Sequence, residues 1–268
     1  MPEIRGITIS VNYGPLLAVT LVRNMRHLTE CLVVTSHDDR ETQDVARSIP
    51  GVSVLATDAF CRHGAAFNKG LAMEEGFEAL GRDGWILIWD ADCLLPDRPA
   101  YDGIQPGWLY GSRRRILEDP TRFRDGLDWS ELPISHDGGP IGFHQLFHAD
   151  AIADKRPWYD VSFSHAGGGD AYFMTHWDRS RLSVLNMDVL HLGPKDTNWF
   201  GTSPEARDVM AAYVVRNGWD RSHPLVDRTA DARVGEIVER VTVPGYEPSG
   251  YELPFVLRSR RLIRGGLP

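Results

Sequence analysis

Apolar and polar segments alternate along the first ninety residues in an order that predicts strands separated by helices. Four short apolar segments are predicted to be strands: residues 7–11, 31–35, 52–55 and 85–89. Helices are predicted between them, from Pro15 onwards and over residues 41–49 and 66–80. This repeated order favours right-handed βαβ units and a doubly wound α/β sheet. Because residues 85–89 contain no polar side chain, we expect that strand to be buried on both faces of the sheet.

The pattern changes after residue 92. Further strands are predicted over residues 108–110 and 143–147, with one or two more over residues 182–192, and a helix follows three glycines at about residues 170–177. Ser203 and Pro204 are typical of a helix start, which predicts a helix over residues 203–217. A last helix near residues 230–241 precedes a tail rich in proline and arginine. We therefore expect a small C-terminal helical extension over residues 203–268.

Composition and charge narrow the classes of function. The 268 residues are 42% hydrophobic and 25% charged, which is typical of a globular chain. A net charge of −8 gives no general attraction to nucleic acid or anionic membranes, although Arg113–Arg115 and Arg258–Arg264 are locally basic. Three cysteines without a C-x-x-C spacing favour a reducing compartment. With no leader-like start and no apolar run of about 20 residues, we expect a cytoplasmic protein without a membrane span.

Asp90 and Asp92 follow the apolar strand 85–89 directly. In extended backbone, residues two apart point the same way, so both carboxylates can face one ion. Carboxylates suit Mg²⁺ or Mn²⁺, and the carboxyl ends of parallel strands are where open α/β sheets bind ligands. The alternative is a polar loop with two solvated aspartates.

The motifs around these aspartates resemble a known family. The segments Phe67-Asn68-Lys69-Gly70-Leu71-Ala72 and Trp85-Ile86-Leu87-Ile88-Trp89-Asp90-Ala91-Asp92 resemble family-2-like glycosyltransferases with the GT-A fold. The resemblance covers about residues 7–192. It implies a mixed, mostly parallel sheet flanked by helices, in a catalytic domain over residues 1–202. Residues 1–98 would bind a nucleotide sugar, most commonly linked to uridine diphosphate, and residues 99–202 would bind the acceptor.

The resemblance also implies roles for individual residues. Asp90 and Asp92 would hold Mn²⁺ or Mg²⁺ against the donor diphosphate, and His191 would be a third ligand, or else a packed residue at a strand end. Contacts to the nucleotide are expected from Asp38, Asp39, Arg62 and Asn68. Helix capping is the alternative for Asp38 and Asp39, and Arg62 is equally compatible with a surface arginine. Lys195, in the glycine-flanked loop 193–201, would approach the phosphates if this loop is a lid.

Asp170 is the candidate catalytic base. It matches the aspartate of the family's Gly-Glu-Asp region, and an inverting transferase needs a carboxylate to accept the proton of the acceptor hydroxyl. Gly169 replaces the usual glutamate, so the inverting stereochemistry does not follow from the motif. The alternative for Asp170 is a helix N-cap.

The motifs leave other functions and the acceptor open. A nucleotidyltransferase or a haloacid-dehalogenase-like phosphatase also uses an Asp-x-Asp after an apolar strand, and a nucleotide-sugar-binding protein without catalysis is a further alternative. The chain lacks the Gln-x-x-Arg-Trp pattern of processive synthases, which favours a non-processive, hexosyltransferase-type enzyme. The acceptor hydroxyl would belong to a sugar, a protein, a small metabolite or a modified DNA base.

Overall fold

The computed structural model describes residues 2–65, 67–162, 166 and 169–193. The C-terminal helices expected over residues 203–217 and 230–241, and Lys195 in the expected lid, lie outside the described residues. No helix in the described part of the chain has both the length and the apolar character needed to cross a membrane.

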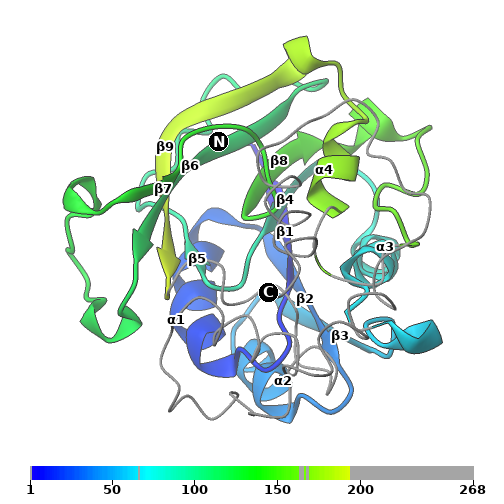
Figure 1. The fold of residues 1–268 in the computed structure, drawn as a ribbon, viewed down its shortest axis with the longest axis horizontal. Coiled ribbons are helices and arrows are strands. Elements are labelled where there is room, and N and C mark those ends of the chain that lie inside the picture. The colour runs from blue at the N-terminus through cyan, green and yellow to red at the C-terminus, as the bar shows by residue number, and fades with distance from the viewer. Residues whose placement is uncertain (1, 66, 163–165, 167–168, 194–268) are drawn as a thin grey trace, which may run out of the picture.

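A single mixed sheet forms the centre of the described residues (Figure 1). Its nine strands are β1 (Ile4–Ile9), β2 (Glu30–Ser36), β3 (Val52–Thr57), β4 (Trp85–Trp89), β5 (Cys93–Leu94), β6 (Leu109–Leu117), β7 (Ile134–His136), β8 (His144–His148) and β9 (Leu182–Leu192). Their order is β3-β2-β1-β4-β8-β6-β9-β5, and β7 pairs with β6. Only β5, β7 and β8 run against the other strands. The predicted α/β class with a mixed, mostly parallel sheet is confirmed.

Helices cover both faces of this sheet (Figure 1). The α-helices are α1 (Gly14–Asn24), α2 (Arg40–Arg47), α3 (Lys69–Leu80) and α4 (Gly169–Met174). Helices α1 and α2 pack on one face through Leu17, Leu21 and Ala46, and α3 and α4 pack on the other through Phe77 and Phe173. Short 3-10 helices lie at Met25–His27, Arg62–Gly64, Pro120–Arg122, Trp129–Glu131, Ala149–Ile152 and Arg179–Arg181.

Strand β4 is buried on both faces, as its uninterrupted apolar sequence predicts. Ile86 and Ile88 pack towards α3 and α4, and Leu87 and Trp89 pack towards α1; each of these four side chains is at most 1% exposed. Burial of one such side chain contributes roughly 1.5–3 kcal/mol. The strand therefore gives the residues that follow it a rigid base. It also joins the two predicted halves of the domain, because it pairs with β1 on one side and β8 on the other.

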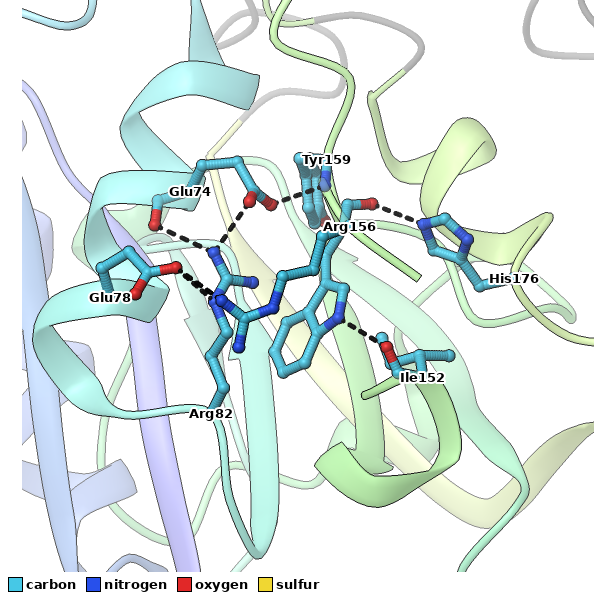
Figure 2. A network of polar contacts seen from close by, with 8 residues as sticks. Glu74, Glu78, Arg82, Ile152, Arg156, Tyr159 and His176 are labelled. Carbon is cyan, nitrogen blue, oxygen red and sulfur yellow. Dashed lines mark hydrogen bonds and ion pairs between the residues drawn. The ribbon is translucent and has the colours of Figure 1, made fainter. Parts of the chain in front are cut away.

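Charged residues on the outer part of α3 tie this helix to the segment that follows β8 (Figure 2). Arg82 lies 2.7 Å from Glu74 and 2.8 Å from Glu78, and Arg156 lies 3.2 Å from Glu78. The Arg82 guanidinium also stacks on Trp158 at 4.5 Å from the ring centroid. We call Glu74, Glu78, Arg82 and Arg156 the Arg82 network.

Candidate functional site

The carboxyl ends of β1, β2, β3 and β4 meet at one edge of the sheet because these strands are parallel neighbours. This edge carries Asp38 and Asp39 after β2, Arg62 after β3, and Asp90 and Asp92 after β4. Open α/β sheets bind their ligands at such an edge. The topology therefore brings these predicted residues to the same side of the molecule.

Asp92 and His191 meet through the pairing of β5 with β9. Cys93 lies opposite His191 in this ladder, and the Leu192 N–H donates to the Asp92 carbonyl at 2.9 Å. As a result, His191 Nε2 lies 3.3 Å from Asp92 Oδ2, and both residues are only 6% exposed. The histidine predicted as a third ligand thus lies beside the second predicted aspartate.

The other nitrogen of His191 is held by the backbone. Nδ1 lies 3.1 Å from the Gly193 carbonyl, which requires the Nδ1–H form. A backbone partner on one ring nitrogen leaves the other to face a metal, and it is the usual arrangement of a metal-binding histidine. Burial lowers the pKa of the His191 imidazole, but the charge and hydrogen bond of Asp92, together with the charge of Asp90, outweigh burial and raise it.

The donor atoms and spacing in this pair fit a divalent cation. Adjacent ligands of an octahedral Mg²⁺ at about 2.1 Å are about 3 Å apart, close to the separation of His191 Nε2 and Asp92 Oδ2. No three His, Cys, Asp or Glu residues gather around one point in the described part of the chain. Mg²⁺ commonly uses one or two carboxylates, with substrate phosphates and water as the remaining ligands. The described residues are compatible with such a partial set.

Helix α1 fixes the backbone of the Asp90–Asp92 turn. Thr20 Oγ1 donates to the Ala91 carbonyl at 2.6 Å. Asn24 donates to the Cys93 carbonyl and accepts from the Leu95 N–H, both at 2.9 Å. Thr20 and Asn24 are completely buried. Two polar side chains on the apolar face of α1 therefore hold the turn that presents the aspartates.

Lys69, the first residue of α3, lies among three carboxylates. Its Nζ is 3.3 Å from Asp90 Oδ1. The Lys69 ammonium also lies near the carboxylate of Asp170, because both border the same point beside Gly142. A Cβ added at Gly142 would lie 3.4 Å from Lys69 Nζ and 3.2 Å from Asp170 Oδ2. Burial lowers the pKa of Lys69, but the charges of Asp90, Asp170 and Asp92 outweigh burial and raise it. We call Lys69, Asp90, Asp92, Asp170 and His191 the carboxylate site.

Asp170 opens α4 and is oriented by the backbone of Gly142, whose N–H donates to Asp170 Oδ2 at 2.9 Å. Gly169 precedes it, where the resembling family has glutamate. A Cβ on Gly169 would lie 3.1 Å from the ring of Tyr159, which is completely buried. A larger side chain at residue 169 would therefore press on the core. This packing gives a physical reason for the glycine.

The predicted nucleotide contacts have different surroundings. Asp39 is 3% exposed and caps α2 by accepting from the Thr42 N–H at 3.0 Å, as the capping alternative predicts. Asp38 is exposed. Asn68 caps α3 through the Leu71 N–H at 2.8 Å, and Arg62 forms ion pairs with Asp58 and Glu75. Of these four residues, Asp38 is the one whose side chain is exposed at the edge of the sheet.

Lys69, Thr20 and Asn24 belong to the site, although the sequence motifs do not single them out. Lys69 stands inside the motif that carries the resemblance, and its position after the helix cap Asn68 was a usable signal. The signal for Thr20 and Asn24 was their helical spacing with Leu17 and Leu21, which places polar groups on a buried helix face. Their hydrogen-bond partners depend on the three-dimensional fold.

Comparison with known proteins gives structural neighbours only. No family model matches the chain, and no curated protein matches its sequence. The structure of GalNAc-T7 with UDP, GalNAc and Mn²⁺ is 11% identical, with a TM-score of 0.49; the match covers 88% of this chain and 55% of that one, so it spans about half of that enzyme. The 4-diphosphocytidyl-2C-methyl-D-erythritol synthase of Anaerococcus prevotii is 15% identical over 80% of this chain and 99% of that one, with a TM-score of 0.44. The glucosyl-3-phosphoglycerate synthase of Mycobacterium tuberculosis is 16% identical over 82% of both chains, also with a TM-score of 0.44. These values concern the arrangement of helices and strands alone.

Proposed function

We propose that this protein is a metal-dependent glycosyltransferase that moves a sugar from a nucleoside diphosphate, most simply uridine diphosphate, to a hydroxyl acceptor. The observation that carries this proposal is the carboxylate site. Three carboxylates lie around one lysine at the carboxyl edge of the sheet, and one of them, Asp92, pairs with the buried His191. Such a site combines ligands for a divalent cation with a cationic group for a phosphate.

Each side chain of the site has a role in this proposal. Asp92 and His191 would hold the cation, which when bound neutralises charge on the leaving diphosphate, and Asp90 would approach it from the same turn. Lys69 would donate from its ammonium to a phosphate oxygen, exchanging part of its interaction with Asp90 for the donor. Asp38, which is exposed after β2, would contact the nucleoside.

Asp170 would accept the proton of the acceptor hydroxyl. The Gly142 N–H fixes the position of its Oδ2. An inverting transfer, with Asp170 facing the acceptor and Asp92 facing the donor, is the simplest use of this arrangement.

A thermal-shift screen with nucleotide sugars tests the proposal. A donor bound with Mn²⁺ stabilises the folded protein by about 2.7 kcal/mol at a hundred times its dissociation constant. We expect an Mn²⁺-dependent rise in melting temperature with one nucleotide sugar, and loss of this rise in Asp92→Asn. Asp102→Asn, at an exposed aspartate, is the matched control and should keep it. If no nucleotide sugar raises the melting temperature in the presence of Mn²⁺ or Mg²⁺, the proposal is wrong.

The products distinguish the alternatives. Slow, Mn²⁺-dependent release of the free sugar from the bound donor supports transfer to water in the absence of an acceptor. Nucleotide-sugar binding without turnover would indicate a binding protein. Release of pyrophosphate from a nucleoside triphosphate would indicate a nucleotidyltransferase, and release of phosphate from a phosphate monoester would indicate a phosphatase.

A further inference from the structure

The three consecutive arginines of β6 divide between the two faces of the sheet. Arg113 and Arg115 point to one face, where their Nε atoms lie 2.7 Å and 2.6 Å from the two carboxylate oxygens of Asp188 on β9. Because side chains alternate along a strand, Arg114 points to the opposite face. Asp188 thus neutralises part of the basic segment but not its middle arginine.

Arg114 shares its face of the sheet with His191. Strands β6 and β9 are parallel neighbours in which Arg114 pairs with Val189 and Ile116 pairs with His191. Alternation therefore places the Arg114 and His191 side chains on the same face, with backbones roughly 8 Å apart. Consistent with this separation, the positive charge of Arg114 partly counteracts the rise in the pKa of His191.

The Arg114 guanidinium is held in place but has no carboxylate partner in the described part of the chain. Its Nε donates to Ser135 Oγ at 3.1 Å, and its Cζ lies 4.9 Å from the centroid of the Phe143 ring. No aspartate or glutamate of the described residues lies within ion-pair distance of Arg114, which is partly exposed. A guanidinium stacked on a ring and fixed at Nε is pre-organised, with its terminal nitrogens suited to bind an oxyanion.

The backbone links this arginine to the proposed base. Phe143, on which Arg114 stacks, directly follows Gly142, whose N–H binds Asp170. The Gly142–Phe143 segment therefore contacts the proposed base through one residue and Arg114 through the next. The donor diphosphate already has Lys69 and the predicted cation to balance its charge.

We propose that Arg114 binds a carboxylate or phosphate group of the acceptor, so that the acceptor is a small hydroxylated anion rather than a neutral sugar. This inference rests on the proposed function, because it assigns the acceptor side of the same site. It predicts that acceptor recognition depends on the planar guanidinium as well as on its charge.

Three probes with one carbon skeleton test the inference. Glycerol, D-glycerate and sn-glycerol 3-phosphate are titrated calorimetrically into the full chain with Mn²⁺ and uridine diphosphate present. We expect at least one anion to bind and glycerol to bind more weakly, and the two anions separate carboxylate from phosphate recognition. Arg114→Gln should weaken binding of the anion by roughly 10- to 100-fold, as expected for loss of a hydrogen bond between charged groups. Arg113→Gln is the matched control and should change it by less than about twofold.

Separate readouts identify which claim fails. Uridine diphosphate affinity should be the same in wild type and Arg114→Gln; a loss there instead would assign Arg114 to the donor and overturn the inference. Equal binding of glycerol and both anions would also overturn it, as would equal effects of Arg113→Gln and Arg114→Gln. Arg114→Lys keeps the charge and should bind the anion with intermediate affinity, which covers the case in which Arg114→Gln folds poorly. If the proposed function is wrong, the wild-type protein should not bind uridine diphosphate at all. The anion titrations are then repeated without nucleotide.

Discussion

Helix α3 contributes to two groups of charged residues that differ in how their charges are balanced. The Arg82 network joins two glutamates to two arginines, and Arg82 is only 5% exposed. The carboxylate site, at the first turn of the same helix, sets three aspartates against one lysine and an imidazole. Burial of like charges costs free energy unless another charge compensates. The charges of the first group are therefore balanced by one another, whereas the second group is suited to a cation from outside.

Replacement of Arg82 tests the Arg82 network and should lower the free energy of unfolding more than any other change proposed below. Arg82→Met leaves Glu74, which is 13% exposed, without its partner, and removes the stacking on Trp158. We expect the free energy of unfolding to fall by about 3–5 kcal/mol, as when one member of a buried pair is removed. Urea denaturation measures this change. Arg156→Met, at a side chain 54% exposed, should cost less than about 1 kcal/mol; equal costs would contradict the comparison.

Replacement of Lys69 tests the carboxylate site, in which the negative charges outnumber the positive ones. Lys69→Met removes the one lysine that lies among the three carboxylates in the described part of the chain, so nucleotide affinity should fall roughly 10- to 100-fold. Without nucleotide, Mn²⁺ should bind more tightly, because the ammonium no longer competes for Asp90. Calorimetry with Mn²⁺ alone and with uridine diphosphate measures both changes. Lys155→Met, at an exposed lysine, is the control. Weaker binding of Mn²⁺ to Lys69→Met in the absence of nucleotide would contradict the proposed role.

A buried neutral histidine outside the Arg82 network and the carboxylate site should make the stability of the protein fall at acid pH. Burial lowers the pKa of His144 on β8 from 6.5 to about 3. Below pH 6.5 the unfolded chain binds a proton that the folded chain does not, so the free energy of unfolding falls with pH by up to about 1.4 kcal/mol per unit. The stability that the neutral His144 contributes is fully present above pH 6.5 and is lost as the pH drops towards 3. Denaturation between pH 7 and 5 should show a shallower slope in His144→Phe; an unchanged slope would contradict this assignment.

The hydroxyl of Thr20 should have a small effect on stability but a specific effect on the site. Thr20→Val keeps the shape and leaves the Ala91 carbonyl without its donor, at a cost of about 1 kcal/mol in the free energy of unfolding. We expect a roughly tenfold loss of Mn²⁺ affinity, because the turn that carries the aspartates loosens. Thr29→Val removes a similar hydrogen bond, to the Ile4 carbonyl at the other end of the sheet. An equal loss of Mn²⁺ affinity in both variants would show that the effect is not local.

The local sequence pattern predicts elements well where their burial is uniform. The strand 85–89 is found with the predicted limits because it is apolar throughout. Residues 182–192, where burial is mixed and the pattern allows one or two strands, form one. Strand β6 is longer than the predicted 108–110 and continues to Leu117. The additional part contains Arg113–Arg115, and three consecutive arginines do not show the apolar pattern of a strand. Asp188 on β9 stabilises this part by pairing with Arg113 and Arg115. A pairing partner distant in the sequence cannot be recognised from local periodicity.

The candidate site follows the same rule. The spacing of Asp90 and Asp92 after β4 predicts their place at the sheet edge. The proximity of Asp92 and His191 depends on the β5–β9 pairing, and the position of Lys69 depends on how α3 packs. The metal, nucleotide and base roles of these residues remain predictions, because a role depends on a bound partner as well as on position.

The distribution of the carboxylate site along the chain has a consequence for how the protein folds. Its residues come from the start of α3, the turn after β4, the start of α4 and the end of β9. Contacts between segments so far apart in sequence close large loops, and such contacts form slowly because loop closure costs chain entropy. The edge strand β5 finds its partner only when β9 has been added to the sheet. During refolding, the capacity to bind a ligand would therefore arise among the last native properties, after the βαβ units of the first half.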